Sequence, residues 1–156
     1  MIKLAFFDMD GTLCAPRFYV GGKMVPGMSD EAWLEFCRKN GEDTYRFCTP
    51  VPQVTAHAEE LRRTGAVLFV LSASQSEEEN AAKRKFVRVN MPGLFEEVIT
   101  VDADDKKIPT IRRIAEERGV ALSDCEIVED TYGLVLKATV AGINATHVSH
   151  LCCKRD

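Results

Sequence analysis

A run of apolar residues leads into two carboxylates, a glycine and a threonine in Phe6-Phe7-Asp8-Met9-Asp10-Gly11-Thr12-Leu13. The segment Ile2–Phe7 is almost wholly apolar, which predicts a strand buried on both faces of a parallel sheet. Open α/β sheets bind their ligands just beyond the carboxyl ends of such strands. We therefore expect an α/β protein whose site begins directly after its first strand.

The two carboxylates in this stretch favour a site that contains a cation. Asp8 and Asp10 are two positions apart, so their side chains project to the same side if the chain stays extended. Carboxylates beside a buried strand are unfavourable unless a cation or hydrogen bonds compensate their charge. Gly11 lets the backbone turn away, and Thr12 offers a hydroxyl to cap that turn. The pair alone is also compatible with a plain acidic turn, but the residues around it favour function.

Length and composition limit the class of protein. The 156 residues suffice for one ordinary domain and are too few for two. An apolar content of 46% predicts a real core rather than disorder. A net charge of −4 gives no electrostatic reason to expect nucleic acid or an anionic membrane as the partner. We find no signal-peptide pattern and no apolar run long enough to span a bilayer, so a cytoplasmic protein is predicted.

The cysteines and the C-terminal histidines raise the question of a metal site. The six cysteines are scattered without a CxxC pattern, so free thiols are predicted. The tail is His147-Val148-Ser149-His150-Leu151-Cys152-Cys153. A strand through this region would place His147 and Ser149 on one face and His150 on the other, which separates the potential ligands. We therefore expect a last strand followed by a frayed end.

Apolar runs of strand length alternate with amphipathic segments along the chain. The predicted strands are Ile2–Phe7, Val67–Leu71, Val98–Val101, Cys125–Val128 and Ala145–Ser149. The predicted helices are Pro52–Thr64, Ser76–Asn90, Pro109–Arg118 and Gly133–Ala141. This alternation predicts right-handed crossovers, a parallel sheet and helices on both of its faces.

The segment from about 14 to 51 interrupts the alternation. Arg17–Val20 and Lys23–Val25 flank Gly21-Gly22, a pattern typical of a β-hairpin with a tight primed turn. A short helix is predicted from Ser29 to about Lys39, with Trp33 and Phe36 at the spacing of packing residues. We expect a small lid on a single domain that comprises residues 1–156. Its candidates for substrate contact are Phe18, Tyr19, Lys23 and Met24.

Two further strand ends carry groups that suit a phosphate and a cation. Ser72 follows the second strand, where a hydroxyl and nearby N–H groups can donate to a phosphate oxygen. The cap of the next helix can be Ser74 or Ser76 instead. Asp130 follows the fourth strand and can give an anionic oxygen to a divalent cation. Mg²⁺ favours a few carboxylates together with water and a substrate phosphate.

A lysine before the third long helix can balance this negative charge. Lys106 and Lys107 are both candidates, and the acidic run before them, Asp102–Asp105, is expected to be a solvated loop. Lys107 is preferred because it stands four residues before Ile111, the first core-facing residue of the helix.

Taken in order, these motifs resemble those of the haloacid dehalogenase (HAD) superfamily of phosphohydrolases. The resemblance covers nearly the whole chain and rests on Asp8-Met9-Asp10-Gly11-Thr12, Ser72, Lys107 (or Lys106) and Glu129-Asp130. It implies a HAD-like Rossmannoid fold. In this fold a five-stranded parallel sheet has the strand order 5-4-1-2-3, helices cover both faces, and a β-hairpin forms a flap.

The resemblance also implies roles for individual residues. Asp8 is the expected nucleophile, which forms an aspartyl-phosphate, and Asp10 is the expected general acid and base. The phosphate-binding residues are expected to be Ser72, Lys107 and Thr12. The implied cofactor is Mg²⁺, held by Asp8, Asp130 and the backbone carbonyl of Asp10, with Glu129 beside the ligands. The presence of Asp10 argues against dehalogenation, because the dehalogenases of this family lack that acid.

The sequence departs from the family pattern in two places. Many members carry a second aspartate four residues after the fourth-motif aspartate, where this chain has Leu134. Glu129-Asp130 is similar to the pair in phosphoglucomutase-like members. The insert is also much smaller than the helical caps of many small-molecule phosphatases.

The leading hypothesis is a Mg²⁺-dependent phosphatase that hydrolyses a small-molecule phosphomonoester. A phosphomutase of sugar phosphates is the first alternative, and it needs a cap that excludes water. A non-catalytic phosphate-binding regulatory module is the second. The sequence does not identify the substrate, and a homo-oligomer is left open.

Overall fold

A central parallel sheet organises the chain, whose residues 1–153 are described by a computed structural model. From one edge to the other the strands are β7 (Glu97–Val101), β6 (Val67–Ala73), β1 (Leu4–Phe7), β8 (Cys125–Glu129) and β9 (Asn144–His147). All four pairings are parallel, and Phe7 stands opposite Val70 on one side and Val128 on the other. The predicted strand order is therefore confirmed.

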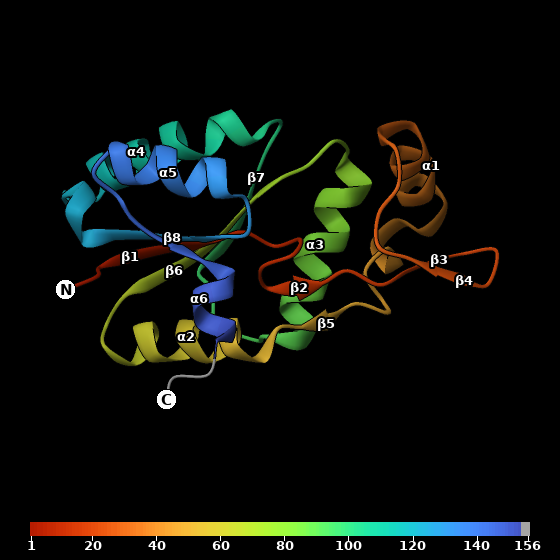
Figure 1. Cartoon of the computed structure of the whole chain (residues 1–156), viewed down its shortest axis with the longest axis horizontal. Helices are drawn as coiled ribbons and strands as arrows, with labels where there is room; N and C mark the ends of the chain where they lie inside the picture. The colour runs from red at the N-terminus through yellow and green to blue at the C-terminus, as the bar shows by residue number, and fades with distance from the viewer. Residues whose placement is uncertain (154–156) are drawn as a thin grey trace.

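Helices cover both faces of this sheet (Figure 1). The helices are α2 (Pro52–Arg63), α3 (Glu77–Asn90), α4 (Lys107–Glu117), α5 (Tyr132–Val140) and α6 (Val148–Cys152). Alternate residues of β1 point to opposite faces, as strand geometry requires. Leu4 and Phe6 pack with α4 and α5, while Ala5 and Phe7 pack with α2 and α3. Both cores thus fix β1 in the middle of the molecule, and its carboxyl end carries Asp8.

The insert consists of short elements that pack beside α3. They are β2 (Cys14–Ala15), β3 (Phe18–Val20), β4 (Lys23–Val25), α1 (Asp30–Asn40), a 3-10 turn at Gly41–Asp43 and β5 (Thr49–Pro50). The predicted hairpin is confirmed: Val20 pairs with Lys23, and the turn between them has φ of 58° at Gly21 and 77° at Gly22. β2 and β5 pair antiparallel where the insert begins and ends.

Aromatic rings hold the insert together and attach it to the sheet domain. The Phe18 ring packs against Trp33, with centroids 4.9 Å apart, and Trp33 stacks on Phe36. Tyr45 contacts Phe18 on one side and Phe86 of α3 on the other. The prediction that Trp33 and Phe36 serve packing is confirmed, and the insert shares one apolar core with α3.

The predicted C-terminal strand is wrong beyond His147. β9 ends there, and α6 follows at once in place of the expected frayed end. The His147 side chain caps α6, since its Nδ1 accepts the N–H of Ser149 at 3.2 Å. Because Ser149 and His150 lie on a helix, the argument that placed them on opposite strand faces does not hold. The thiols are free, as predicted.

Other element ends differ by a residue or two. α4 begins at Lys107 rather than at Pro109, after a short 3-10 turn at Asp104–Lys106. Among residues 1–153, no helix combines the length and the apolar character that a membrane crossing requires.

Candidate active site

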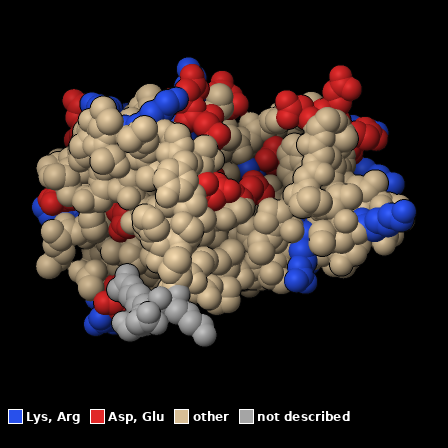
Figure 2. Space-filling model, viewed as in Figure 1, with Lys and Arg blue, Asp and Glu red and all other residues tan. Residues whose placement is uncertain are grey.

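The carboxyl ends of β1, β6 and β8 surround a hollow of about 270 Å³. It is lined by Asp8, Asp10, Ser72, Ala73, Asp104, Lys107, Glu129, Asp130 and Thr131. In Figure 2 acidic side chains surround the hollow that separates the sheet domain from the insert. The structure thus brings together Asp8, Asp10, Ser72, Lys107 and Asp130, as the sequence predicted.

Lys107 is the lysine that enters the hollow. Its side chain is 2% exposed, and Nζ lies 2.8 Å from Asp8 Oδ1 and 2.9 Å from Glu129 Oε2. Asp104 Oδ1 is a third partner at 3.0 Å. Burial opposes the charge on Lys107, but the carboxylates of Asp8 and Glu129 outweigh it and hold its pKa above the ordinary value. Lys106 does not line the hollow; it belongs to the turn before α4.

Negative charge is concentrated around Asp8. Burial raises the pKa of Asp8 to about 7, with Lys107 opposing this shift and the charge of Glu129 adding to it. Burial also raises the pKa of Glu129 and that of Asp130. One ammonium group therefore does not fully compensate these carboxylates, and a divalent cation would relieve the excess.

Three carboxylates are arranged to hold such a cation. Oxygen atoms of Asp8, Glu129 and Asp130 lie within 4.8 Å of one another. Hard oxygen ligands in this number suit Mg²⁺. Glu129 differs from the other two, because its Oε1 accepts the N–H groups of Asp130 and Thr131, each at 3.2 Å, and its Oε2 binds Lys107. Both oxygens of Glu129 therefore already accept hydrogen bonds within the site.

The backbone after Asp8 turns tightly. Leu13 N donates to the carbonyl of Asp8 at 3.3 Å, and Cys14 N donates to that of Met9 at 2.9 Å. Neither of these bonds uses the carbonyl of Asp10. Gly11 has φ of +78°, a conformation that favours glycine.

The side chain of Asp10 is directed to the insert side of the hollow. Its Oδ2 accepts the hydroxyl of Tyr45 at 3.1 Å and lies 3.1 Å from Nζ of Lys83. Sequence reasoning missed both residues. The sequence offered a signal for Lys83 alone. On α3, Glu79 and Lys83 stand one turn apart on the same face as apolar residues that include Ala82 and Phe86.

Ser72 and Thr12 have different environments. Ser72 is 1% exposed, and its Oγ accepts Nζ of Lys83 at 2.9 Å. The N-cap of α3 is Ser76, whose Oγ accepts the N–H of Glu79, so Ser72 does not cap this helix. Thr12 is fully buried and does not line the hollow; among residues 1–153 its hydroxyl has no hydrogen-bond partner.

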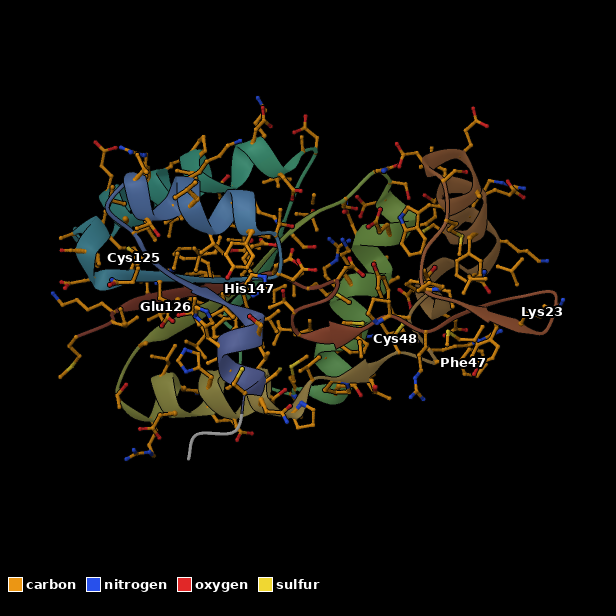
Figure 3. All side chains as sticks on the ribbon, in the orientation of Figure 1. Lys23, Phe47, Cys48, Cys125, Glu126 and His147 are labelled. Carbon is orange, nitrogen blue, oxygen red and sulfur yellow. The ribbon has the colours of Figure 1, made fainter. Side chains whose placement is uncertain are left out.

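The hairpin does not reach this hollow. The candidates Phe18, Tyr19, Lys23 and Met24 are all absent from its lining. Figure 3 shows Lys23 at the far tip of the hairpin, directed away from the sheet. The insert contacts the site through Tyr45 instead.

His147, which the sequence analysis considered only as a metal ligand of the C-terminal tail, contacts the backbone of the site residue Asp130. Its Nε2 lies 2.9 Å from the backbone carbonyl of Asp130, and its ring packs against Tyr132 with centroids 4.4 Å apart. Because Nδ1 accepts from Ser149, Nε2 is the atom that donates to Asp130.

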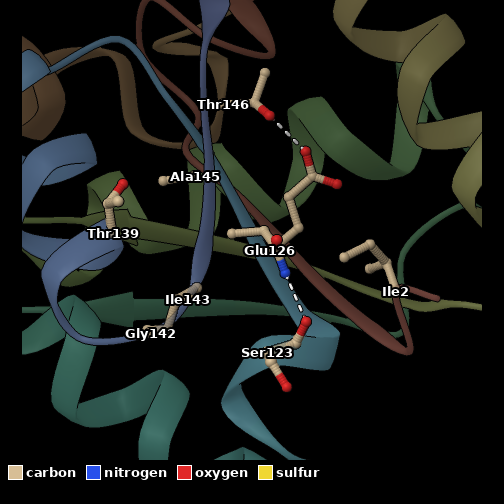
Figure 4. Close-up of a pocket in the computed structure, with 9 residues that line it drawn as sticks. Ile2, Ser123, Glu126, Thr139, Gly142, Ile143, Ala145 and Thr146 are labelled. Carbon is tan, nitrogen blue, oxygen red and sulfur yellow. Dashed lines mark hydrogen bonds between the residues drawn. The ribbon is translucent and has the colours of Figure 1, made fainter.

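A larger open hollow of about 610 Å³ lies beside β9 (Figure 4). Its acidic side chain, Glu126, already accepts the hydroxyl of Thr146 at 2.7 Å and lies 3.1 Å from Nε2 of His57. Asn144 Nδ2 donates to the carbonyl of Ser123 at 2.7 Å. These polar groups satisfy one another, so this hollow is not the candidate site.

Comparison with models of known protein families finds no match, and comparison with curated protein sequences finds none either. Solved structures do match. A proposed phosphoglycolate phosphatase from Lactobacillus delbrueckii subsp. bulgaricus has a TM-score of 0.63 at 14% identity, over 93% of this chain and 85% of that one. A phosphoserine phosphatase, solved as an analogue of its phospho-aspartyl intermediate, has a TM-score of 0.62 at 16% identity, with coverage of 97% and 90%.

A HAD-family enzyme from Bacteroides thetaiotaomicron, in complex with magnesium and inorganic phosphate, has a TM-score of 0.55 at 12% identity. It covers 94% of each chain. The chain has the haloacid dehalogenase fold. The fold that the sequence motifs implied is therefore confirmed, and the HAD-like sheet places its polar strand ends at a common edge.

Proposed function

We propose that this chain is a Mg²⁺-dependent phosphatase that hydrolyses a small phosphomonoester. The observation that carries the proposal is the separation of two carboxylates in one hollow. Asp8 lies against Lys107 near Asp130, while Asp10 binds Lys83 and Tyr45. Structural neighbours with magnesium and phosphate, or with a phospho-aspartyl analogue, support the same chemistry.

The residues at the strand ends would bind a phosphate through charge and through hydrogen bonds. Lys107 supplies positive charge, and the hydroxyl of Ser72 can donate to a phosphate oxygen. The cation is assigned to Asp8, Asp130 and the backbone carbonyl of Asp10, with Glu129 behind them. When bound, Mg²⁺ neutralises phosphate oxygens and keeps the charge of Asp8 from repelling the substrate. We also propose that Thr12 contributes to phosphate binding through the turn to which it belongs, because its side chain is fully buried.

The proposed reaction has two transfers at phosphorus. An oxygen of Asp8 attacks, an aspartyl-phosphate forms, and the ester P–O bond breaks as Asp10 gives its proton to the leaving oxygen. Water then attacks the phosphorus of the intermediate, Asp10 takes a proton from that water, and the carboxylate of Asp8 is released. Asp10 suits both steps because its side chain remains 38% exposed to incoming water and outgoing alcohol.

This exposure favours hydrolysis over the phosphomutase alternative, which needs an intermediate shielded from water. The complete set of polar groups argues against a regulatory module without turnover. We further propose that residues 1–156 form a single HAD-like domain with the insert at about 14–51.

The decisive experiment measures phosphate release from p-nitrophenyl phosphate with Mg²⁺. Wild-type protein should release phosphate, and Asp8→Asn should reduce the rate by at least about a thousandfold, since the amide cannot act as the nucleophile. Asp105→Asn, an exposed aspartate outside the hollow, is the matched control and should keep full activity. Equal rates for wild type and Asp8→Asn would contradict the proposal.

A further inference from the structure

A second lysine is buried at the edge of the site. Lys83 is fully buried in α3, and its Nζ contacts the carbonyl of Ala73 as well as three side chains. Those partners are Glu79 Oε1 at 2.8 Å, Ser72 Oγ at 2.9 Å and Asp10 Oδ2 at 3.1 Å. A buried ammonium group is costly unless its protons are fully used. Here four acceptors lie within hydrogen-bond distance of Nζ, so each of its three N–H groups has a partner.

Glu79 balances the charge of this lysine. It is 4% exposed and stands one helical turn before Lys83. Its other oxygen accepts the backbone N–H of Gln75 at 2.8 Å, which fixes the carboxylate at the start of α3. The two residues thus form a buried pair without net charge. Such a pair can offer N–H donors to the site without changing the charge balance around the phosphate.

The contact with Ser72 determines which way its hydroxyl donates. Ser72 Oγ accepts a hydrogen bond from Nζ of Lys83, so its own proton must point elsewhere. Its nearest internal acceptor, the carbonyl of Ala73, is 3.4 Å away, too long for a strong bond. A phosphate oxygen in the hollow would be a much better acceptor.

The contact with Asp10 selects one of its two oxygens. Lys83 and the hydroxyl of Tyr45 both bind Oδ2. Oδ1 is therefore left for proton exchange with the leaving group or with water. A fixed carboxylate matters because small misplacement of a reacting group costs a large part of the rate.

We propose that Lys83 is a positioning residue that holds Asp10 and Ser72 in their working orientations, with Glu79 as its buried counter-ion. The proposal rests on the phosphatase function proposed above. A purely structural role is the competing explanation, because any buried ion pair contributes to the packing of α3.

The test removes both charges together, in Glu79→Gln with Lys83→Met, so that no unpaired ion is buried. The matched control is Glu117→Gln with Arg113→Met, which removes an exposed ion pair of the same spacing on α4. Both proteins are melted with and without Mg²⁺. Inorganic phosphate is titrated calorimetrically in the presence of Mg²⁺, and turnover is measured on p-nitrophenyl phosphate and on glycerol phosphate.

We expect the buried-pair variant to fold, to bind phosphate about tenfold more weakly, and to lose about a hundredfold in kcat on glycerol phosphate. The loss on p-nitrophenyl phosphate should be about tenfold smaller, since its leaving group departs without a proton from Asp10. The control variant should match wild type throughout.

Phosphate affinity within about twofold of wild type, together with equal losses on both esters, would overturn the proposal. Failure of the buried-pair variant to fold would also overturn it, in favour of a structural role. A wild-type protein that binds phosphate without hydrolysing either ester refutes the phosphatase, and the titration alone then decides whether Lys83 orients Ser72. A wild-type protein that binds no phosphate refutes both proposals.

Discussion

The carboxylate of Asp130 occupies the space that a side chain at Gly11 would need. A Cβ at Gly11 would lie 2.2 Å from Asp130 Oδ2, well inside any permitted contact. The first motif and the fourth motif therefore fit each other across the strand ends of β1 and β8. The glycine therefore allows the position of Asp130 as well as the turn.

Gly11→Ala should damage the site more than the fold. The substitution costs about 1–2 kcal/mol through its positive φ and displaces Asp130 as well. We expect Mg²⁺ affinity, measured by calorimetry, to fall by at least about tenfold, and turnover by about a hundredfold. Gly21→Ala is the control, because its φ is +58° and nothing lies within 4 Å of the new Cβ. Equal Mg²⁺ affinities in the two variants would show that Asp130 does not hold the cation.

Asp130→Asn should raise the Mg²⁺ concentration needed for activity by about tenfold or more. The neighbouring helix cannot compensate, because the position four residues later is Leu134, which is buried in the core. Glu129→Gln is the comparison: it keeps the size of the side chain and one acceptor oxygen, for Lys107 or for the N–H groups, and should change the Mg²⁺ requirement less. A larger increase in the Mg²⁺ requirement for Glu129→Gln than for Asp130→Asn would indicate that Glu129 is the direct ligand.

The stabilising effect of Mg²⁺ should grow with pH. The pKa of Asp8 is raised from 3.8 to about 7, so the folded metal-free protein keeps a proton that the unfolded chain has already lost. Its stability therefore falls as pH rises between these two values and levels off above them. Mg²⁺ must displace that proton, and its apparent affinity should drop by up to about tenfold per pH unit below the raised pKa.

Melting temperatures with and without Mg²⁺, at about pH 5.5 and about pH 8, provide the measurement. The Mg²⁺-induced increase should be clearly larger at the higher pH. Asp8→Asn has no such proton to lose and should show a smaller difference between the two conditions. An equal increase in wild type at both values would contradict the assignment of Asp8 to the cation.

The sequence predicted the sheet and the residues at its strand ends because both follow from short-range patterns. Apolar runs predict strands. Asp8 and Asp130 come directly after one, and Ser72 is the next-to-last residue of another. Lys83 could not be found in this way. On α3 it is one of several charged residues. Its place among apolar positions of the helix was a signal of burial, but only the tertiary contact with Asp10 connects it with the site.

The C-terminal error has a similar cause. His147 to Ser149 has the alternation of a strand, but the side chain of His147 caps a helix that starts at the next residue. The hairpin was predicted correctly from Gly21-Gly22, yet its direction depends on packing between Phe18 and Trp33 that no local pattern reveals.

Tyr45→Phe tests which part of the insert serves the site. The hydroxyl of Tyr45 donates to Asp10, while its ring packs between Phe18 and Phe86. Phenylalanine keeps the ring and loses only the hydrogen bond, so stability should fall by about 1 kcal/mol at most. We expect kcat on glycerol phosphate to fall by about tenfold, because Asp10 loses one of the two groups that fix Oδ2.

Tyr19→Phe is the matched control for this substitution. Tyr19 is another tyrosine of the insert, 44% exposed and outside the hollow, and its variant should keep wild-type kcat. Substrate ranking across a panel of phosphate esters should likewise be unchanged. A larger effect at Tyr19 than at Tyr45 would mean that the hairpin closes over the bound substrate, and that the insert acts through its strands rather than through the residue that already touches Asp10.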